Sequence, residues 1–132
     1  AARDRGEGFL SIVDGKVNLV ASQTANFNRT EGLTVMENIL QGNPNVKAVF
    51  AQNDEMALGA LEAITAARKD VIVIGFDATD DAVAKVQAGE MAATVAQQPS
   101  LIGEKAIEAA IKVLAGESVE ENIPVDLELI TK

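Results

Sequence analysis

The stretch Val71-Ile72-Val73-Ile74-Gly75-Phe76-Asp77 decides the fold class. Its first four residues are all β-branched and do not alternate with polar residues, which is typical of a parallel strand covered on both faces. Other short apolar runs lie on either side of it, separated by longer stretches in which apolar residues recur at helical spacing. Together these runs predict five strands, at residues 17–21, 48–51, 71–76, 91–96 and 127–130.

The stretches between the strands have recognisable helix boundaries. One helix is predicted at residues 3–13, and Asn28 or Thr30 can cap the next. Acidic residues at 54–55 and 80–81 suit the first turns of two further helices, because the helix dipole favours negative charge there. Pro99 suits the first turn of the longest helix, whose apolar residues at 107, 110, 111 and 114 we expect to face inward.

Strands alternating with helices over 132 residues predict one α/β domain with a doubly wound, mainly parallel sheet and helices on both faces. Such domains ordinarily open with a strand that becomes central in the sheet. This chain begins on a predicted helix, so we expect a fragment that lacks its first strand.

The composition excludes several classes of function. The chain has no His and no Cys, so it can build neither a Ser–His–Asp or Cys–His nucleophile nor the usual zinc site. A net charge of −9 disfavours nucleic acid and anionic membranes as partners. No apolar run approaches the roughly 20 residues that span a bilayer. We expect no catalytic residue, no cofactor and no metal ion.

Candidate binding residues follow the predicted strands. Asn53, Asp77 and Gln97 come after three of them, and the carboxyl ends of parallel strands meet at one edge of a sheet. Phe27 and Phe76 fall in or beside loops at the same edge. A sugar ring packs its C–H face on an aromatic ring while carboxylates and amides bond its hydroxyls, so this set indicates binding of a neutral polyol. The alternative is that these polar residues only cap the helices that follow.

An enzymatic interpretation is also open. Asp77, Asp80 and Asp81 could hold Mg²⁺ in a phosphotransferase, although acidic residues at a helix N-terminus are the commoner explanation. The loop is similar to the aspartyl nucleophile loop of phosphate-transferring hydrolases, but Thr79 stands where those enzymes need a second Asp. No glycine-rich phosphate loop is present.

Several longer motifs resemble a known family. They are Ala1-Ala2-Arg3-Asp4-Arg5-Gly6-Glu7-Gly8-Phe9, Ala25-Asn26-Phe27-Asn28-Arg29, Val49-Phe50-Ala51-Gln52-Asn53-Asp54-Glu55-Met56-Ala57-Leu58-Gly59-Ala60, Val73-Ile74-Gly75-Phe76-Asp77 and Ala92-Ala93-Thr94-Val95-Ala96-Gln97-Gln98-Pro99. Over residues 1–132 the chain resembles the C-terminal half of bacterial ribose-binding proteins, which are periplasmic receptors of ATP-driven (ABC) importers. The resemblance implies a flavodoxin-like lobe of the type I periplasmic binding protein fold and no enzymatic activity.

By this resemblance, the sugar contacts of the family fall on Arg5, Phe27, Asn53, Phe76, Asp77 and Gln97. The ligand would be D-ribose or a related sugar, and the other partners would be the missing N-terminal lobe and a membrane permease. The location would be the periplasm, or the outer face of the membrane with an anchor. A sugar-responsive transcription regulator of the lac-repressor type shares this fold and is the main alternative.

The resemblance also concerns the last third of the chain. In the family, residues 97–125 would cross to the missing N-terminal lobe. The helix after Pro99 would then lack its normal partner here. We expect that it either folds onto this lobe or is exchanged between chains in a homodimer.

Overall fold

The computed structural model describes residues 2–132. Ala1, the first residue of the family resemblance, lies outside the described residues. The elements in chain order are α1 (Ala2–Val13), α2 (Arg29–Gly42), β1 (Ala48–Phe50), α3 (Asp54–Ala66), β2 (Ile72–Phe76), α4 (Asp80–Ala88), β3 (Ala93–Ala96), α5 (Pro99–Leu114) and β4 (Glu128–Thr131).

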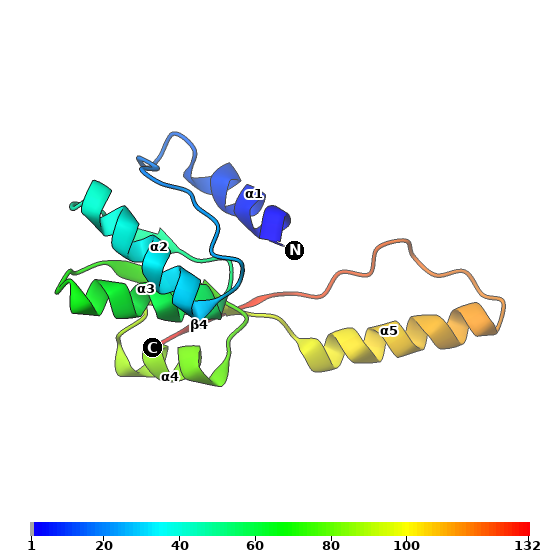
Figure 1. Ribbon diagram of the computed structural model, residues 1–132. Helices are drawn as coiled ribbons and strands as arrows, with labels where there is room; N and C mark the ends of the chain where they lie inside the picture. The colour runs from blue at the N-terminus through cyan, green and yellow to red at the C-terminus, as the bar shows by residue number, and fades with distance from the viewer. Residues whose placement is uncertain (1) are drawn as a thin grey trace.

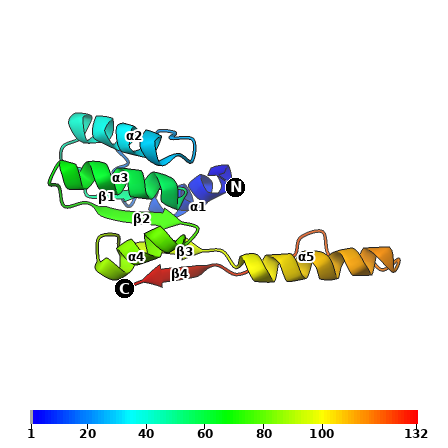
Figure 2. The same ribbon diagram turned by 60° about the horizontal axis from the view of Figure 1, so that its bottom comes forward.

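The four strands form one sheet in the order β1-β2-β3-β4 (Figure 2). β1 pairs with β2 and β2 with β3 in parallel, whereas β4 pairs antiparallel with β3. The predicted α/β class with a mainly parallel sheet is confirmed. Since β1, β2 and β3 run in the same direction, their carboxyl ends lie at one edge of the sheet.

Helices cover the two faces of the sheet unequally. α2, α3 and α4 lie side by side over one face, where the apolar core gathers around Met36, Leu58, Val73 and Val86. α1 lies against the other face, and its Phe9 ring stacks on Phe50 of β1 with centroids 5.0 Å apart. The rest of that face is less well covered, and Ile72 is 54% exposed. The expectation of a strand buried on both faces is therefore only partly met. Val73 is buried on the face that α2–α4 cover, whereas Ile72 is exposed on the other face.

Side chains just before α2, α3 and α4 cap these helices. Asn28 caps α2 by accepting a hydrogen bond from the Glu31 amide at 3.0 Å, which decides between the two candidate caps. Asn53 caps α3 through the Met56 amide, also at 3.0 Å. Thr79 caps α4, and Gly89 ends it with a φ of 79°. Each cap satisfies a backbone donor that the first helical turn leaves unpaired.

The predicted strand at 17–21 is not formed. Residues 18–25 form no regular secondary structure, and Val17, Leu19 and Val20 are exposed. A strand is stable only when a neighbour accepts and donates its ladder of hydrogen bonds. Residues 19 and 21–25 line one cavity with β1 but form no ladder with it, so this apolar segment does not extend the sheet.

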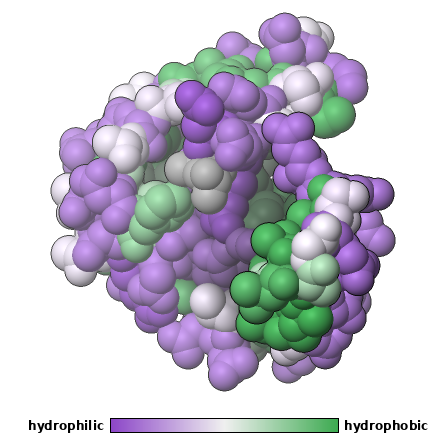
Figure 3. Space-filling model, turned by 90° about the vertical axis from the view of Figure 1, so that its right-hand side faces the viewer, coloured by the Kyte–Doolittle hydropathy of each residue, from purple (hydrophilic) through white to green (hydrophobic). Residues whose placement is uncertain are grey.

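The expectation that residues 107, 110, 111 and 114 of α5 face inward is also wrong. α5 projects away from the sheet, and the chain returns beside it to form β4 (Figure 1). Ile107, Ile111 and Leu114 are 64%, 61% and 87% exposed because no other layer of the described chain covers them. Figure 3 looks along this projection and shows hydrophobic residues gathered beside a hollow. The alternative in which α5 folds onto the lobe is therefore not adopted.

Two glycines allow α2 and α3 to pack closely. A methyl group at Gly59 would overlap the carbonyl oxygen of Arg29 and would lie 2.7 Å from the amide nitrogen of Leu33. At Gly32 it would lie 2.8 Å from the carbonyl oxygen of Met56. The backbones of the N-terminal halves of α2 and α3 are therefore in direct contact.

We predict that Gly59→Ala lowers the free energy of unfolding by about 1–3 kcal/mol, because the added methyl group must push α2 away from α3. Urea unfolding followed by circular dichroism measures this change. Gly8→Ala in α1 is the matched control, since nothing lies within 4 Å of its added methyl group. Equal unfolding midpoints for the two variants would contradict the close-packing argument.

Candidate functional site

The candidate residues gather at the edge of the sheet where the parallel strands end. Asn53 follows β1, Asp77 follows β2 and Gln97 follows β3. Because the three strands are neighbours and parallel, their loops open on the same side. α1 brings Arg5 to this edge from the opposite face of the sheet.

Arg5 connects the group. Its Nη2 donates a hydrogen bond to Asp77 Oδ1 at 2.9 Å, and its Nη1 donates to the carbonyl oxygen of Gln52 at 2.6 Å. The guanidinium lies over the ring of Phe76, 3.8 Å from its centroid. Gln97 Nε2 donates to the same Asp77 oxygen at 3.0 Å. Arg5, Phe76, Asp77 and Gln97 therefore form one connected cluster.

The Asp77 carboxylate is held with one oxygen unused. Both hydrogen bonds reach Oδ1, and Oδ2 has no partner among residues 2–132. The side chain is 32% exposed and that of Arg5 is 14% exposed, so the ion pair is largely removed from water. A carboxylate oxygen fixed in this way can accept a hydrogen bond from a hydroxyl group at little cost in side-chain entropy.

Asn53 and Phe27 take different positions at the same edge. Asn53 caps α3 with Oδ1, as the alternative interpretation expected, but its Nδ2 has no partner in the described chain. The cap therefore leaves a donor for a ligand. Phe27 lies in the loop before α2 with a φ of 56° and is 46% exposed. Within residues 2–132, its ring stacks on no other aromatic ring and carries no cation.

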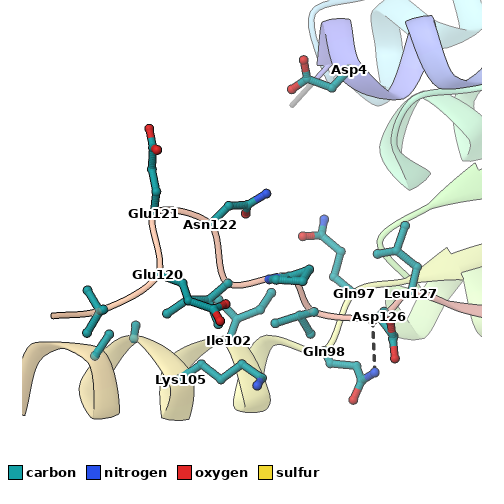
Figure 4. A pocket seen from close by; sticks show the side chains of 16 residues that line it. Asp4, Gln97, Gln98, Ile102, Lys105, Glu120, Glu121, Asn122, Asp126 and Leu127 are labelled. Carbon is teal, nitrogen blue, oxygen red and sulfur yellow. Dashed lines mark hydrogen bonds between the residues drawn. The ribbon is translucent and has the colours of Figure 1, made fainter. Parts of the chain in front are cut away.

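Two cavities border the cluster. One, of about 860 Å³, lies between α5 and the returning chain and includes Gln97 (Figure 4). Figure 4 shows Gln97 and Gln98 pointing in opposite directions, with Gln98 donating to the Asp126 carbonyl oxygen at 3.1 Å. The other, of about 680 Å³, lies between α1, α2 and β1 and includes Phe27 and Gln52. The cluster lies between them, since Gln97 lines the first cavity and Gln52 the second.

Three residues that support the cluster are not singled out by the sequence. Gln52 acts through its backbone oxygen, which accepts a hydrogen bond from Arg5, and no pattern of side chains in the sequence indicates this contact. The sequence indicates Asp54 only as a favourable acid in the first turn of α3, and it is fully buried. Thr94 is also fully buried. A hydroxyl group in the otherwise apolar strand 91–96 is the available indication that a polar partner lies inside.

The acidic residues considered for magnesium do not come together. Asp77 faces Arg5 and Gln97, whereas Asp81 accepts from Arg29 at 3.0 Å. Arg29 also forms two hydrogen bonds with Glu55, at 2.9 and 3.1 Å, and these bonds raise the pKa of Arg29 above its ordinary value. Within residues 2–132 no three acidic side chains are grouped to hold a metal ion.

None of the helices in the described part of the chain combines the length and apolar character needed to cross a bilayer.

Comparison with known proteins identifies the family of this chain. Residues 1–118 match the periplasmic binding protein domain family. The chain belongs to this family. The ribose import binding protein of Haemophilus influenzae is 57% identical over 133 residues and is matched over 100% of this chain and 46% of its own length. The periplasmic binding protein chain described here thus spans less than half the length of this relative and matches its C-terminal part.

Solved structures give the same result. A periplasmic solute-binding protein of an ABC transporter from Actinobacillus succinogenes, with bound D-allose, has a TM-score of 0.91 at 34% identity and is matched over 98% of this chain and 46% of its own. A carbohydrate-transporter solute-binding protein from Agrobacterium radiobacter, in complex with D-arabinose, has a TM-score of 0.88 at 36% identity, with the same coverage. The expected type I periplasmic binding protein fold is confirmed.

We predict that Arg5→Lys loosens the contact of α1 with the sheet, because an ammonium group cannot bond Asp77 and Gln52 together while lying flat on Phe76. Hydrogen exchange should become faster in residues 2–13 and stay unchanged in α3. Arg3→Lys is the matched control on the same helix, since Arg3 pairs only at the surface, with Asp4 at 4.0 Å and Glu7 at 3.7 Å. Equal exchange in both variants would contradict the anchoring role of Arg5.

Proposed function

We propose that this chain binds a monosaccharide without chemical turnover, with D-ribose as the first candidate, and forms the C-terminal half of the solute receptor of an ABC importer. The observation that supports this most is the Asp77 carboxylate, which Arg5 and Gln97 hold by one oxygen while the other stays free. The importer's permease would be its partner, and its place would be the periplasm or an anchored position at the outer membrane face.

The six candidate residues divide the binding task. Asp77 Oδ2 accepts from a sugar hydroxyl, while Asn53 Nδ2 and the Gln97 amide supply neutral polar contacts. Arg5 donates to the ring hydroxyls and keeps Asp77 in place. Phe27 offers the exposed ring for the C–H face of the sugar. Phe76 acts mainly as the platform for Arg5, because one face of its ring is already covered by the guanidinium.

The relatives support the ligand class more firmly than the particular sugar. Relatives at 55–57% identity are named ribose import binding proteins, but solved relatives hold D-allose and D-arabinose. We choose D-ribose because identity to the ribose proteins reaches 57% over the whole chain, against 34–36% for the two sugar complexes.

The cluster and the exposed Phe27 ring cover a sugar from one side only, so a second surface is needed to enclose it. We propose that residues 97–125 cross to an N-terminal lobe, which covers both the exposed side of the sugar and the apolar face of α5. The exposure of Ile107 and Ile111 supports this arrangement, because exposed apolar rows of that kind mark protein interfaces. Exchange of α5 between two copies of the chain would be the competing way to bury the same row.

We predict that Asp77→Asn weakens D-ribose binding roughly 10- to 100-fold, since a hydroxyl bound to a charged acceptor becomes one bound to a neutral amide. Titration calorimetry on the complete polypeptide, as its gene encodes it, measures the affinity. Asp70→Asn is the matched control, because Asp70 is exposed and precedes β2 at the opposite edge of the sheet. An isolated chain of residues 1–132 should bind far more weakly, and tight binding by it would contradict the two-lobe proposal.

We predict that a thiol introduced by Ile111→Cys is protected only when the second lobe is present. This variant should react slowly with an alkylating reagent in the complete polypeptide and quickly in the isolated chain, which has no other cysteine. Lys112→Cys, one residue on and on the polar side of α5, should react quickly in both. Protection of the Ile111→Cys thiol in the isolated chain, together with a dimeric mass by light scattering, would favour segment exchange instead.

A further inference from the structure

A fully buried carboxylate lies directly behind the candidate site. Asp54, the first residue of α3, has no exposed surface. Its Oδ1 accepts from the Thr94 hydroxyl at 2.7 Å, and its Oδ2 accepts from the Thr79 amide at 2.8 Å and the Thr79 hydroxyl at 3.2 Å. Its place at the N-terminus of α3 adds the favourable end of the helix dipole. A buried charge is tolerated only with such compensation, so its partners are held firmly.

Both partners of Asp54 control the turn that carries Asp77. Thr79 ends the turn, and its backbone and side chain are bound to Oδ2. Thr94 lies on β3, and its hydroxyl donates to Oδ1 while accepting from the Ala78 amide at 3.2 Å. Asp54 thus holds the turn at two points, one through β3 and one directly.

The turn needs this support because its backbone is unusual. Asp77 has a φ of 116° and Ala78 a φ of 53°, both in the region that side chains other than glycine rarely adopt. This conformation sends the Asp77 carboxylate toward Arg5 and Gln97, and the Asp77 amide bonds the Val95 carbonyl oxygen at 2.8 Å. Without the anchor, the turn would relax toward a commoner backbone and move Asp77.

The sheet makes room for the buried carboxylate. A methyl group at Gly75 would overlap Asp54 Oδ1 and would lie 3.2 Å from Ala57 Cβ. Gly75 is on β2, two residues before Asp77, so the glycine and the turn belong to one arrangement.

We propose that Asp54, acting through Thr94 and Thr79, is a positioning residue for sugar binding that fixes the 77–79 turn before the ligand arrives. Asp54 does not touch the ligand. The inference rests on the proposed function, since it concerns how Asp77, the main sugar-binding residue in that proposal, is held in place. A site organised in advance loses less free energy when it binds, so the anchor should contribute to affinity as well as to stability.

The test compares two substitutions at Thr94 in the complete polypeptide. Thr94→Val keeps the shape and removes the hydroxyl group, whereas Thr94→Ser keeps the hydroxyl group and removes a methyl group. Affinity for D-ribose and D-allose is measured by calorimetry at about 10 °C, where destabilised variants stay folded. We expect Thr94→Val to lose about 10-fold or more in affinity and Thr94→Ser to stay within about 2-fold of the unmodified protein.

A control separates positioning from general loss of stability. Leu40→Ala removes a buried side chain of α2 far from the turn and should lower the unfolding midpoint without changing affinity. Asp54→Asn is the second test variant, because it places an amide donor where Thr79 or Thr94 already donates. It should lose affinity as Thr94→Val does.

The outcomes distinguish the inference from the proposed function. Wild-type protein that binds neither sugar would refute the proposed function, whatever happens at Thr94. Wild-type binding with unchanged affinity in folded Thr94→Val or folded Asp54→Asn would overturn the positioning role. Equal losses in Thr94→Val and Thr94→Ser would also overturn it, since the hydroxyl group would then not be the cause.

Discussion

The parallel pairing of β1, β2 and β3 is the constraint on which the site depends. Three neighbouring strands that run the same way must end at the same edge, and each is followed there by a loop. Asn53, Asp77 and Gln97 are separated by 24 and 20 residues along the chain and still reach one rim. An antiparallel arrangement would send every second loop to the opposite edge. The antiparallel β4 is the last strand of the sheet and leaves this arrangement intact.

Two carboxylates near this edge of the sheet differ in burial: Asp54 lies inside the protein and Asp77 lies partly at its surface. Asp54 is buried among neutral hydrogen-bond donors, so it serves the backbone of the turn. Asp77 is partly exposed and paired with Arg5, so it can still exchange contacts with a ligand. The difference follows from burial: a carboxylate without access to water needs all its acceptors filled by the protein, whereas one at the surface can keep an oxygen for another molecule.

The apolar surface of this chain is buried unevenly. The core between the sheet and α2–α4 is buried, whereas α5 carries apolar residues that no described neighbour covers, and Leu19 and Val20 are about half exposed. Such surfaces cost free energy in water and are typical of interfaces. The chain, which matches 46% of the length of the relative from Haemophilus influenzae, therefore has its own core and also exposed apolar surface on α5.

Local sequence determined the α/β class, the starts of α2, α3 and α4 to within a few residues, and the strand ends that carry the candidate residues, because these depend on short-range periodicity and on side chains beside their own backbone. It left Asn28 and Thr30 open as caps of α2, and the structure decided for Asn28. It did not determine whether residues 17–21 become a strand or whether α5 is buried, since both need a partner distant in the sequence. Nor did it reveal the role of Asp54. Only the tertiary structure brings Thr94 and Thr79 to that carboxylate, through hydrogen bonds across 40 and 25 residues, and no local pattern records them.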